Sequence, residues 1–145
     1  METNYKITKQ IYESANSLVF QGLLKPNNQP IILKILKENY PTPSELTRYK
    51  QEYEVTRSLN NNVENIIIVY DLNRYKNSLV MLLEDFGGQS LKLLLSQTQL
   101  TLEEFLTITI KITESLAVIH KNNIIHKDIN PSNIIYNPQT GQLKI

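Results

Sequence analysis

The polar segment from His126 to Asn133 contains the residue types of this chain that are best suited to chemistry. It reads His-Lys-Asp-Ile-Asn-Pro-Ser-Asn, so that four residues separate Asp128 from Asn133. A carboxylate can accept the proton of an attacking hydroxyl, and an amide oxygen one loop turn away can hold a metal ion. The alternative is an ordinary turn, because His, Asp, Asn and Pro all favour loops. The loop alone leaves both interpretations open.

Apolar segments flank this loop on both sides and would position it. Upstream, Thr101 and Glu104 have the spacing of a capping box, which predicts the start of a long helix. Apolar residues then recur at spacings of three and four, as is typical of an amphipathic helix: Phe105, Ile108, Ile112, Leu116 and Ile119. Ile124 and Ile125 lead into the loop, and short strands are expected after it at 134–136 and 143–145, separated by a turn through Gly141.

The first half of the chain has the pattern of an antiparallel sheet with one helix. Three strands joined by short links are expected near residues 5–11, 18–20 and 31–36. Thr42 and Glu45 form another capping box with Pro43 at the first helical position, which predicts a helix to about Leu59. Two more strands are expected at 66–70 and 79–83. The fold class is therefore α+β.

The loop and its flanks resemble the catalytic loop of eukaryotic-type protein kinases, His-Arg-Asp followed after four residues by Asn, including Pro131 two residues before that Asn. The resemblance implies that Asp128 is the catalytic base, that Asn133 binds magnesium and that His126 is a buried structural residue. Lys127 stands where many members have an arginine that pairs with a phosphorylated activation loop. Lysine lacks the bidentate fork of arginine, so activation-loop control is expected to be weak.

The same resemblance implies a lysine in the third strand that pairs with a glutamate in the following helix and contacts the phosphates of ATP. Lys34 and Glu52 fit this pattern as catalytic residues, because Lys34 interrupts an apolar strand and Glu52 is expected on the inward side of its helix. Lys37 and Glu54 are the alternatives if the register differs. Each residue taken alone could also be an ordinary surface charge.

The stretch Glu84-Asp85-Phe86-Gly87-Gly88 falls where the family has the hinge whose backbone binds adenine. Glu84 and Phe86 are thus expected to bind ATP, with Leu83 guarding the back of the pocket. Val19 and Leu91 match by position, Val19 as an ATP-binding residue. The implied cofactors are ATP and Mg²⁺.

Three features depart from the family pattern. The glycine-rich loop is absent, with Tyr12, Ser14 and Ser17 in its place, although each serine keeps an N–H donor and adds a hydroxyl. Ile32 replaces a small residue that roofs the adenine, and Asn130 replaces the lysine that neutralises charge on the transferring phosphoryl group in serine/threonine-specific members.

Three functions are therefore considered. The first is a protein kinase that transfers the γ-phosphate of ATP to serine or threonine hydroxyls. The second is a pseudokinase that acts as a binding or scaffold module, favoured by the three departures. The third is a small-molecule phosphotransferase of the aminoglycoside or choline kinase type, against which Pro131 and Lys127 argue.

By this resemblance the chain is the N-terminal half of a kinase domain, with an N-lobe at 1–83, a hinge at 84–88 and an incomplete, mainly helical C-lobe at 89–145. An Asp-Phe-Gly triplet is expected within about three codons downstream. The pattern is also similar to kinase domains at the front of large bacterial multidomain sensor proteins, which implies covalently linked downstream domains. The isolated chain is expected to be inactive, with the face of Phe105, Ile112, Leu116 and Ile119 partly exposed.

Composition excludes several other classes of function. The chain has 145 residues, with 15 Lys and Arg against 14 Asp and Glu, so its net charge of +1 favours neither nucleic acid nor an acidic membrane as a partner. The absence of cysteine excludes disulfides, thiolate zinc sites and a cysteine nucleophile. Residues 1–6 lack the features of a signal peptide, and no apolar run approaches the roughly 20 residues that span a bilayer. A soluble, cytoplasmic protein is expected.

Overall fold

The computed structural model describes residues 4–37, 40–60 and 64–145; the start of the segment in which no signal peptide is expected, residues 1–3, lies outside this range. The chain divides into two compact units. The first contains residues 1–58 and 68–85, and the second contains residues 59–67 and 86–145. The lobe and hinge boundaries expected from the sequence stay predictions.

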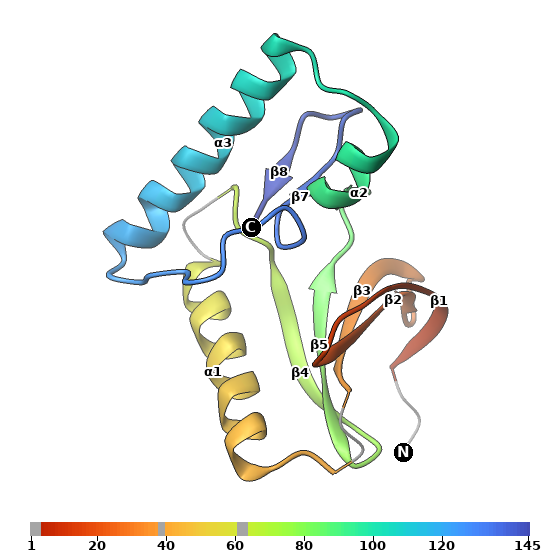
Figure 1. Cartoon of the computed structure of the whole chain (residues 1–145). Coiled ribbons are helices and arrows are strands. Elements are labelled where there is room, and N and C mark those ends of the chain that lie inside the picture. Colours follow the sequence, from red (N-terminus) through yellow and green to blue (C-terminus); the bar gives the residue numbers. More distant parts are fainter. Residues whose placement is uncertain (1–3, 38–39, 61–63) are drawn as a thin grey trace. The chain divides into compact units, whose positions relative to one another are not determined.

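The first unit is built on a five-stranded antiparallel sheet in the order β1-β2-β3-β5-β4 (Figure 1). Its strands are β1 (Tyr5–Glu13), β2 (Ser17–Leu24), β3 (Gln29–Leu36), β4 (Val69–Tyr75) and β5 (Ser78–Glu84). The predicted sheet is thus confirmed. The predicted start of the fourth strand at Ile66 is wrong, because Ile66 is buried with Leu59 and Ile119 in a cluster of the second unit.

Side chains alternate across β3, so the strand supplies both faces of the sheet. Ile31, Leu33 and Ile35 are buried on one face with Val80 and Leu82 of β5. On the other face Leu36 packs with Met81 of β5 and with Tyr49 and Tyr53 of the helix α1 (Pro43–Leu59). The helix therefore covers the face that also carries Lys34.

The start of α1 is the capping box expected from the sequence. The Thr42 N–H donates to Glu45 Oε2 at 2.7 Å, and the Glu45 N–H donates to Thr42 Oγ1 at 3.2 Å. These bonds satisfy amide groups that have no partner within the helix. The Thr42 hydroxyl and the Thr42 N–H both donate to Glu45 Oε2 and lower the pKa of the Glu45 carboxyl, because the ionised form is the better hydrogen-bond acceptor.

The second unit combines two helices with a small antiparallel sheet in the order β6-β7-β8. Its elements are β6 (Gln89–Ser90), α2 (Leu91–Gln97), α3 (Leu102–Lys121), β7 (Ile135–Tyr136) and β8 (Leu143–Lys144). The two strands expected after the loop are present. Helix α2 is not among the elements predicted from the sequence, although Ser90 is a typical N-cap residue and its Oγ accepts from the Leu93 N–H at 3.2 Å.

Helix α3 begins at the predicted capping box of Thr101 and Glu104. Its buried face carries Ile108 and Ile119, each 3% exposed, whereas Phe105 is 55% exposed. The face expected to be partly exposed is exposed at Phe105, half-buried at Ile112 and Leu116, and buried at Ile119, which packs on Leu59 and Ile66. The expectation is therefore wrong only for Ile119.

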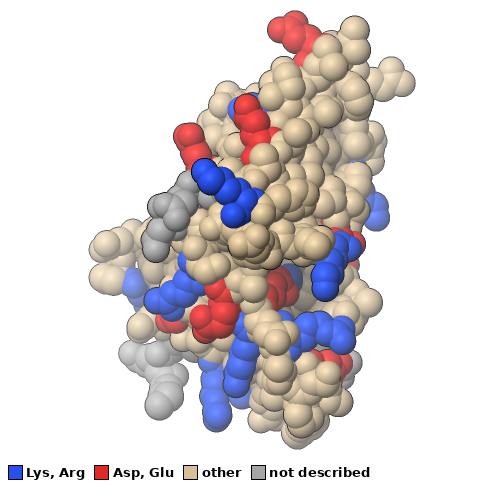
Figure 2. Space-filling model, turned by 90° about the vertical axis from the view of Figure 1, so that its left-hand side faces the viewer, with Lys and Arg blue, Asp and Glu red and all other residues tan. Residues whose placement is uncertain are grey.

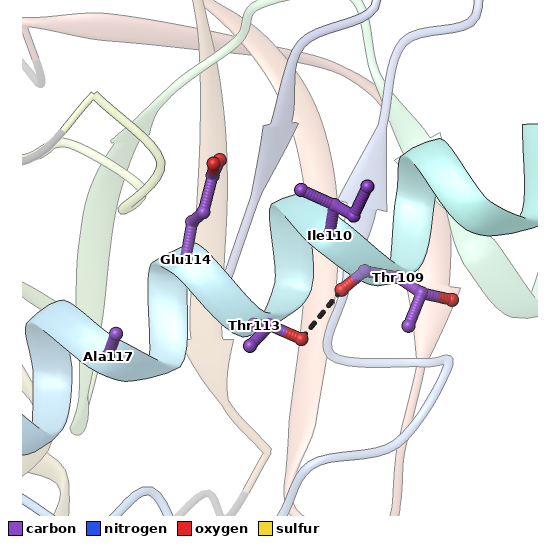
Figure 3. Close-up of a pocket in the computed structure, with 5 residues that line it drawn as sticks. All are labelled: Thr109, Ile110, Thr113, Glu114 and Ala117. Carbon is purple, nitrogen blue, oxygen red and sulfur yellow. Dashed lines mark hydrogen bonds between the residues drawn. The ribbon is translucent and has the colours of Figure 1, made fainter.

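An open hollow runs along the outer side of α3 (Figure 3). It is lined by residues of this one helix, Thr109, Ile110, Thr113, Glu114 and Ala117. Thr113 Oγ1 donates to the Thr109 carbonyl at 2.8 Å within it, so this polar group is already satisfied by the helix backbone. The hollow contains none of the residues predicted to act on ATP.

On the surface shown in Figure 2, basic and acidic side chains lie among one another and large areas carry neither. This distribution agrees with the net charge of +1. Among the described residues, no helix has the length and apolar character needed to cross a membrane.

Candidate active site

The structure brings Lys34 of β3 and Glu52 of α1 together. Lys34 Nζ lies 2.5 Å from Glu52 Oε1, so the predicted contact is present. The alternative pair is Lys37 with Glu54. In the structure Lys37 Nζ instead lies 2.5 Å from Glu13 Oε1. The Lys34 and Glu52 side chains are 28% and 46% exposed, so water screens the pair and its contribution to stability is about 0.2–1 kcal/mol. The main physical effect of the contact is to orient the ammonium group.

Tyr49 ties α1 to the strand at the residue that bears this lysine. Its hydroxyl donates to the Lys34 carbonyl at 2.5 Å, and its side chain is 4% exposed. Burial, and to a smaller extent the charge of Glu52, raises the pKa of the Tyr49 hydroxyl above its ordinary value, so the group remains a donor. Glu52 lies one helical turn further along, and this anchor therefore places its carboxylate beside Lys34.

The residues of the sheet that are predicted to surround the adenine, Val19, Ile32 and Leu83, lie on the same sheet face as Lys34. Val19 of β2 is directly paired with Lys34, and Leu83 of β5 is directly paired with Ile32. Directly paired residues of neighbouring strands project to one face, and Ile32 and Lys34 share a face because side chains alternate. The register therefore gathers all four residues around one area of the sheet.

The turn between β1 and β2 is closed by its own serines. The N–H groups of Asn16 and Ser17 donate to Ser14 Oγ at 3.3 and 3.0 Å, and the Ser14 N–H donates to the Ser17 carbonyl at 2.8 Å. The two serine hydroxyl oxygens are 2.9 Å apart. The N–H groups that Ser14 and Ser17 keep in place of glycine are therefore bonded within the turn in this conformation. Tyr12 lies in β1 with 42% of its surface exposed.

In the loop after α3, both carboxylate oxygens of Asp128 are held by amide side chains. Asn133 Nδ2 donates to Asp128 Oδ2 at 2.8 Å and to its carbonyl at 2.9 Å, and Asn130 Nδ2 donates to Asp128 Oδ1 at 2.9 Å. Asn130 Oδ1 in turn accepts from the Ser132 N–H at 2.9 Å. The loop therefore fixes the carboxylate on an exposed surface with two neutral donors.

The two residues before Asp128 in the loop have specific backbone and side-chain geometry. His126 Nδ1 accepts from the Asp128 N–H at 3.3 Å. His126 is half-buried, not buried as expected, because it lies in a loop between exposed residues, with Ile125 70% exposed. Lys127 has φ +66°, a left-handed conformation that a non-glycine residue adopts only at some cost.

The predicted hinge residues are anchored through their backbone. The Glu84 N–H donates to the Ile68 carbonyl at 3.0 Å, and Glu84 Oε1 accepts from the Ile68 N–H at 2.7 Å. The Glu84 side chain thus holds the segment entering β4. In the second unit, the Phe86 carbonyl accepts from Asn137 Nδ2 at 3.0 Å, and the N–H of the buried Leu91 donates to the Ile134 carbonyl at 2.8 Å.

The residue types fit a nucleotide and its metal ion. Because Asn133 presents its Nδ2 to Asp128, the opposite end of the amide offers Oδ1 as a hard oxygen ligand. Within the part of the chain that the structure describes, no three His, Asp or Glu residues gather as a metal cage. Magnesium is usually bound through one or two protein oxygens together with substrate phosphates.

A lysine paired with a helix glutamate beneath an antiparallel sheet, together with an asparagine bonded to the aspartate of a His-x-Asp loop, defines the kinase class of phosphotransferase folds. Comparison with known families agrees with this class. The protein kinase domain family matches residues 5–145, and the chain belongs to this family.

The similar curated proteins are serine/threonine-protein kinases. A protein of Clostridium perfringens named a probable serine/threonine-protein kinase is 27% identical over 143 residues, which cover 97% of this chain and 20% of that protein. PknL of Mycobacterium tuberculosis is 24% identical over 147 residues, covering 100% of this chain and 36% of PknL. PrkC of Bacillus subtilis is 29% identical over 120 residues, which cover 81% of this chain and 18% of PrkC. The chain thus spans between 18% and 36% of the length of these three relatives.

Sequence reasoning missed two polar arrangements at this site. The closed serine turn required knowledge of the hairpin register, which local spacing does not provide. The bond from Asn137 to Phe86 joins residues 51 positions apart. A signal for it exists in the sequence, since Asn137 directly follows the short strand after the catalytic loop, but an asparagine there is equally typical of a turn.

Proposed function

We propose that this chain supplies the nucleotide-binding sheet and the catalytic loop of a serine/threonine protein kinase that uses MgATP. The observation that carries the proposal is the Asp128 carboxylate, exposed and fixed through both oxygens by Asn130 and Asn133. A carboxylate held in this way is oriented to accept a proton from a hydroxyl that approaches it. The matched family and the names of its relatives support the same reaction.

Each residue then has a defined part in the reaction. Asp128 accepts the proton of the serine or threonine hydroxyl, and Asn133 holds magnesium through Oδ1. Lys34, oriented by Glu52, contacts the phosphates of ATP, and Val19 and the backbone of Glu84 and Phe86 contact the adenine. Magnesium supplies positive charge that offsets the charge developing on the transferring group.

The cellular setting is part of the proposal. The reaction is placed in the cytoplasm, where MgATP is the common phosphoryl donor. The relative from Clostridium perfringens is about five times longer than its matched segment, which covers 20% of its length. This supports further domains in the same polypeptide, which would bring protein substrates to the kinase domain.

A pseudokinase is the second candidate, favoured by the closed turn at residues 14–17. In this turn the N–H groups of Ser14, Asn16 and Ser17 are bonded within the loop, so they are not presented to phosphates. Asn130 also leaves Asp128 without a neighbouring lysine in the loop position where serine/threonine kinases carry one. The closed turn weakens the support for nucleotide binding, and Asn130 weakens the support for phosphoryl transfer.

The test uses the protein encoded by the complete open reading frame that contains these residues. Transfer of labelled γ-phosphate to a protein substrate rich in serine and threonine is expected, and Asp128→Asn should lower kcat by about 10²–10⁴-fold. Asp71→Asn, at an exposed aspartate of β4, is the matched control and should keep the rate. MgATP binding without transfer would establish the pseudokinase instead. Transfer only to aminoglycosides or choline would refute the protein kinase.

A further inference from the structure

The predicted adenine-binding residue Phe86 is held by the hairpin that follows the catalytic loop. Asn137, directly after β7, donates from Nδ2 to the Phe86 carbonyl at 3.0 Å. Lys144 of β8 places Nζ 5.5 Å from the centre of the Phe86 ring, within the range of a cation–π interaction. Both the backbone and the side chain of Phe86 are therefore fixed by the β7–β8 hairpin.

Asn137 is itself held rigidly in this position. It is 6% exposed, and its Oδ1 accepts from the N–H groups of Gln139 and Thr140 at 3.0 and 3.3 Å. Its backbone N–H donates to the Gln142 carbonyl at 2.9 Å. With the carbonyl end of the amide committed to the turn, the Nδ2 end can only point at Phe86. If the Phe86 carbonyl moved away, the buried Nδ2 donor would be left without an acceptor, which destabilises the folded state.

Two glycines let the chain approach this anchor closely. Gly87 has φ +77°, and a Cβ at that position would lie 3.2 Å from Asn137 Nδ2. A Cβ at Gly88 would lie 2.8 Å from two ring carbons of Phe86 and 2.6 Å from Ile135 Cγ2. The Phe86 ring therefore folds back over Gly88, and only glycine fits beneath it.

From these contacts we propose that Asn137 and Lys144 are positioning residues for nucleotide binding, which fix the backbone of Phe86 and turn its ring onto the β7–β8 hairpin. The inference rests on the proposed function, because it takes residues 84–88 as the adenine-binding segment. Adenine then meets the backbone of this segment in one preset conformation, and the Phe86 side chain contributes through its packing on Gly88 and Lys144. Neither Asn137 nor Lys144 takes part in proton or phosphoryl transfer.

Asn137→Asp is the sharpest test, because aspartate keeps the oxygen that accepts from Gln139 and Thr140 and puts a carboxylate oxygen in place of the nitrogen that donates to Phe86. In hydrogen exchange of the 145-residue chain, the amides of residues 86–88 should exchange faster by about 2–13-fold, the factor expected for one lost hydrogen bond. Thr140→Ala is the matched control, since Thr140 Oγ1 forms its hydrogen bonds with Gln142 and none with Phe86 or Asn137 among the described residues. It should leave exchange at these residues unchanged.

The kinetic test uses the protein from the complete open reading frame. Asn137→Asp should raise KM for ATP by a similar factor, about 2–13-fold, with kcat changed less than about 2-fold. Lys144→Met, which keeps the length of the side chain but removes its charge, should raise KM in the same direction. If Asn137→Asp does not fold, Lys144→Met tests the positioning role on its own.

Unchanged exchange at residues 86–88 together with an unchanged KM would overturn the proposal, as would a lower kcat at constant KM. If the unaltered protein binds MgATP but transfers no phosphate, the proposed function fails, and the dissociation constants of the same variants decide this inference instead. If the unaltered protein binds no MgATP, the positioning role is refuted.

Discussion

The ion pair between Lys34 and Glu52 is expected to contribute little to the stability of the fold and much to the use of ATP, and one set of variants can measure both contributions. The change is Glu52→Gln, which keeps the size of the side chain and removes its charge. Because the two side chains are 28% and 46% exposed, the pair adds only about 0.2–1 kcal/mol to the free energy of unfolding. For a chain of this length, its loss should lower Tm by no more than about 4 °C.

The effect on nucleotide use should be far larger than the effect on stability. Without Glu52, the Lys34 ammonium loses the contact that orients it, and kcat/KM for ATP should fall by about 10²-fold or more, as for other preorganised charged groups. The double variant Lys34→Met with Glu52→Gln should be little worse than Lys34→Met alone, because the two residues act as a unit. Thermal unfolding of the 145-residue chain and steady-state kinetics of the complete protein measure the two effects.

The chain offers matched controls for this experiment. Glu13→Gln breaks the pair with Lys37, which has the same 2.5 Å distance and similar exposure, and Glu54→Gln alters an exposed glutamate of the same helix. Both should leave kcat/KM for ATP unchanged. Equal effects of the Glu13 and Glu52 variants on kcat/KM would refute the assignment. A loss of more than about 3 kcal/mol of stability in Glu52→Gln would show instead that the pair is structural.

Three further predictions follow from the second unit. Ile108→Ala should lower the free energy of unfolding by about 2–5 kcal/mol, whereas Ile110→Ala, on the same helix but 58% exposed, should change it by less than about 0.5 kcal/mol in denaturant titrations. Asn130→Lys should raise kcat several-fold with KM for ATP nearly unchanged, and an unchanged kcat would count against the loop assignment. Hydrogen bonds from Thr101 lower the pKa of the Glu104 carboxyl below its ordinary 4.5. Its contribution is therefore present above pH 4.5 and lost as the pH falls through the lowered value, so Glu104→Gln should weaken the acid dependence of stability.

The elements specified by local patterns could be predicted from the sequence. Both capping boxes mark helix starts correctly, because a cap is a contact between residues three positions apart. The alternation of β3 indicated that Lys34 interrupts an apolar strand, and the structure pairs it with Glu52. The fixed spacing of Asp128 and Asn133 likewise reflects a contact made within one loop.

The errors arose where an apolar residue had more than one possible partner. Ile66 follows the pattern of a strand, but its position is decided by burial against Leu59 and Ile119. Leu59 is close to Ile66 in the sequence, whereas Ile119 is far from it. Phe105 follows the helical pattern of Ile108, yet it is exposed. Periodicity identifies an apolar stripe without specifying which of its members a neighbouring segment will cover.

The sequence by itself determined the fold class, the starts of α1 and α3 and the loop that carries Asp128, since each depends on residues within a few positions of one another. Only the tertiary structure decided that the turn at 14–17 closes on its own serines and that Asn137 holds Phe86. Asparagine and serine can bond many partners, and their side chains carry no periodic signal. For Asn137 the partner is set by the distant backbone group that the fold leaves beside it, because a buried polar group must find an acceptor or donor wherever packing places it. The serine bonds at 14–17 are local, but they require the turn conformation that the β1–β2 hairpin imposes.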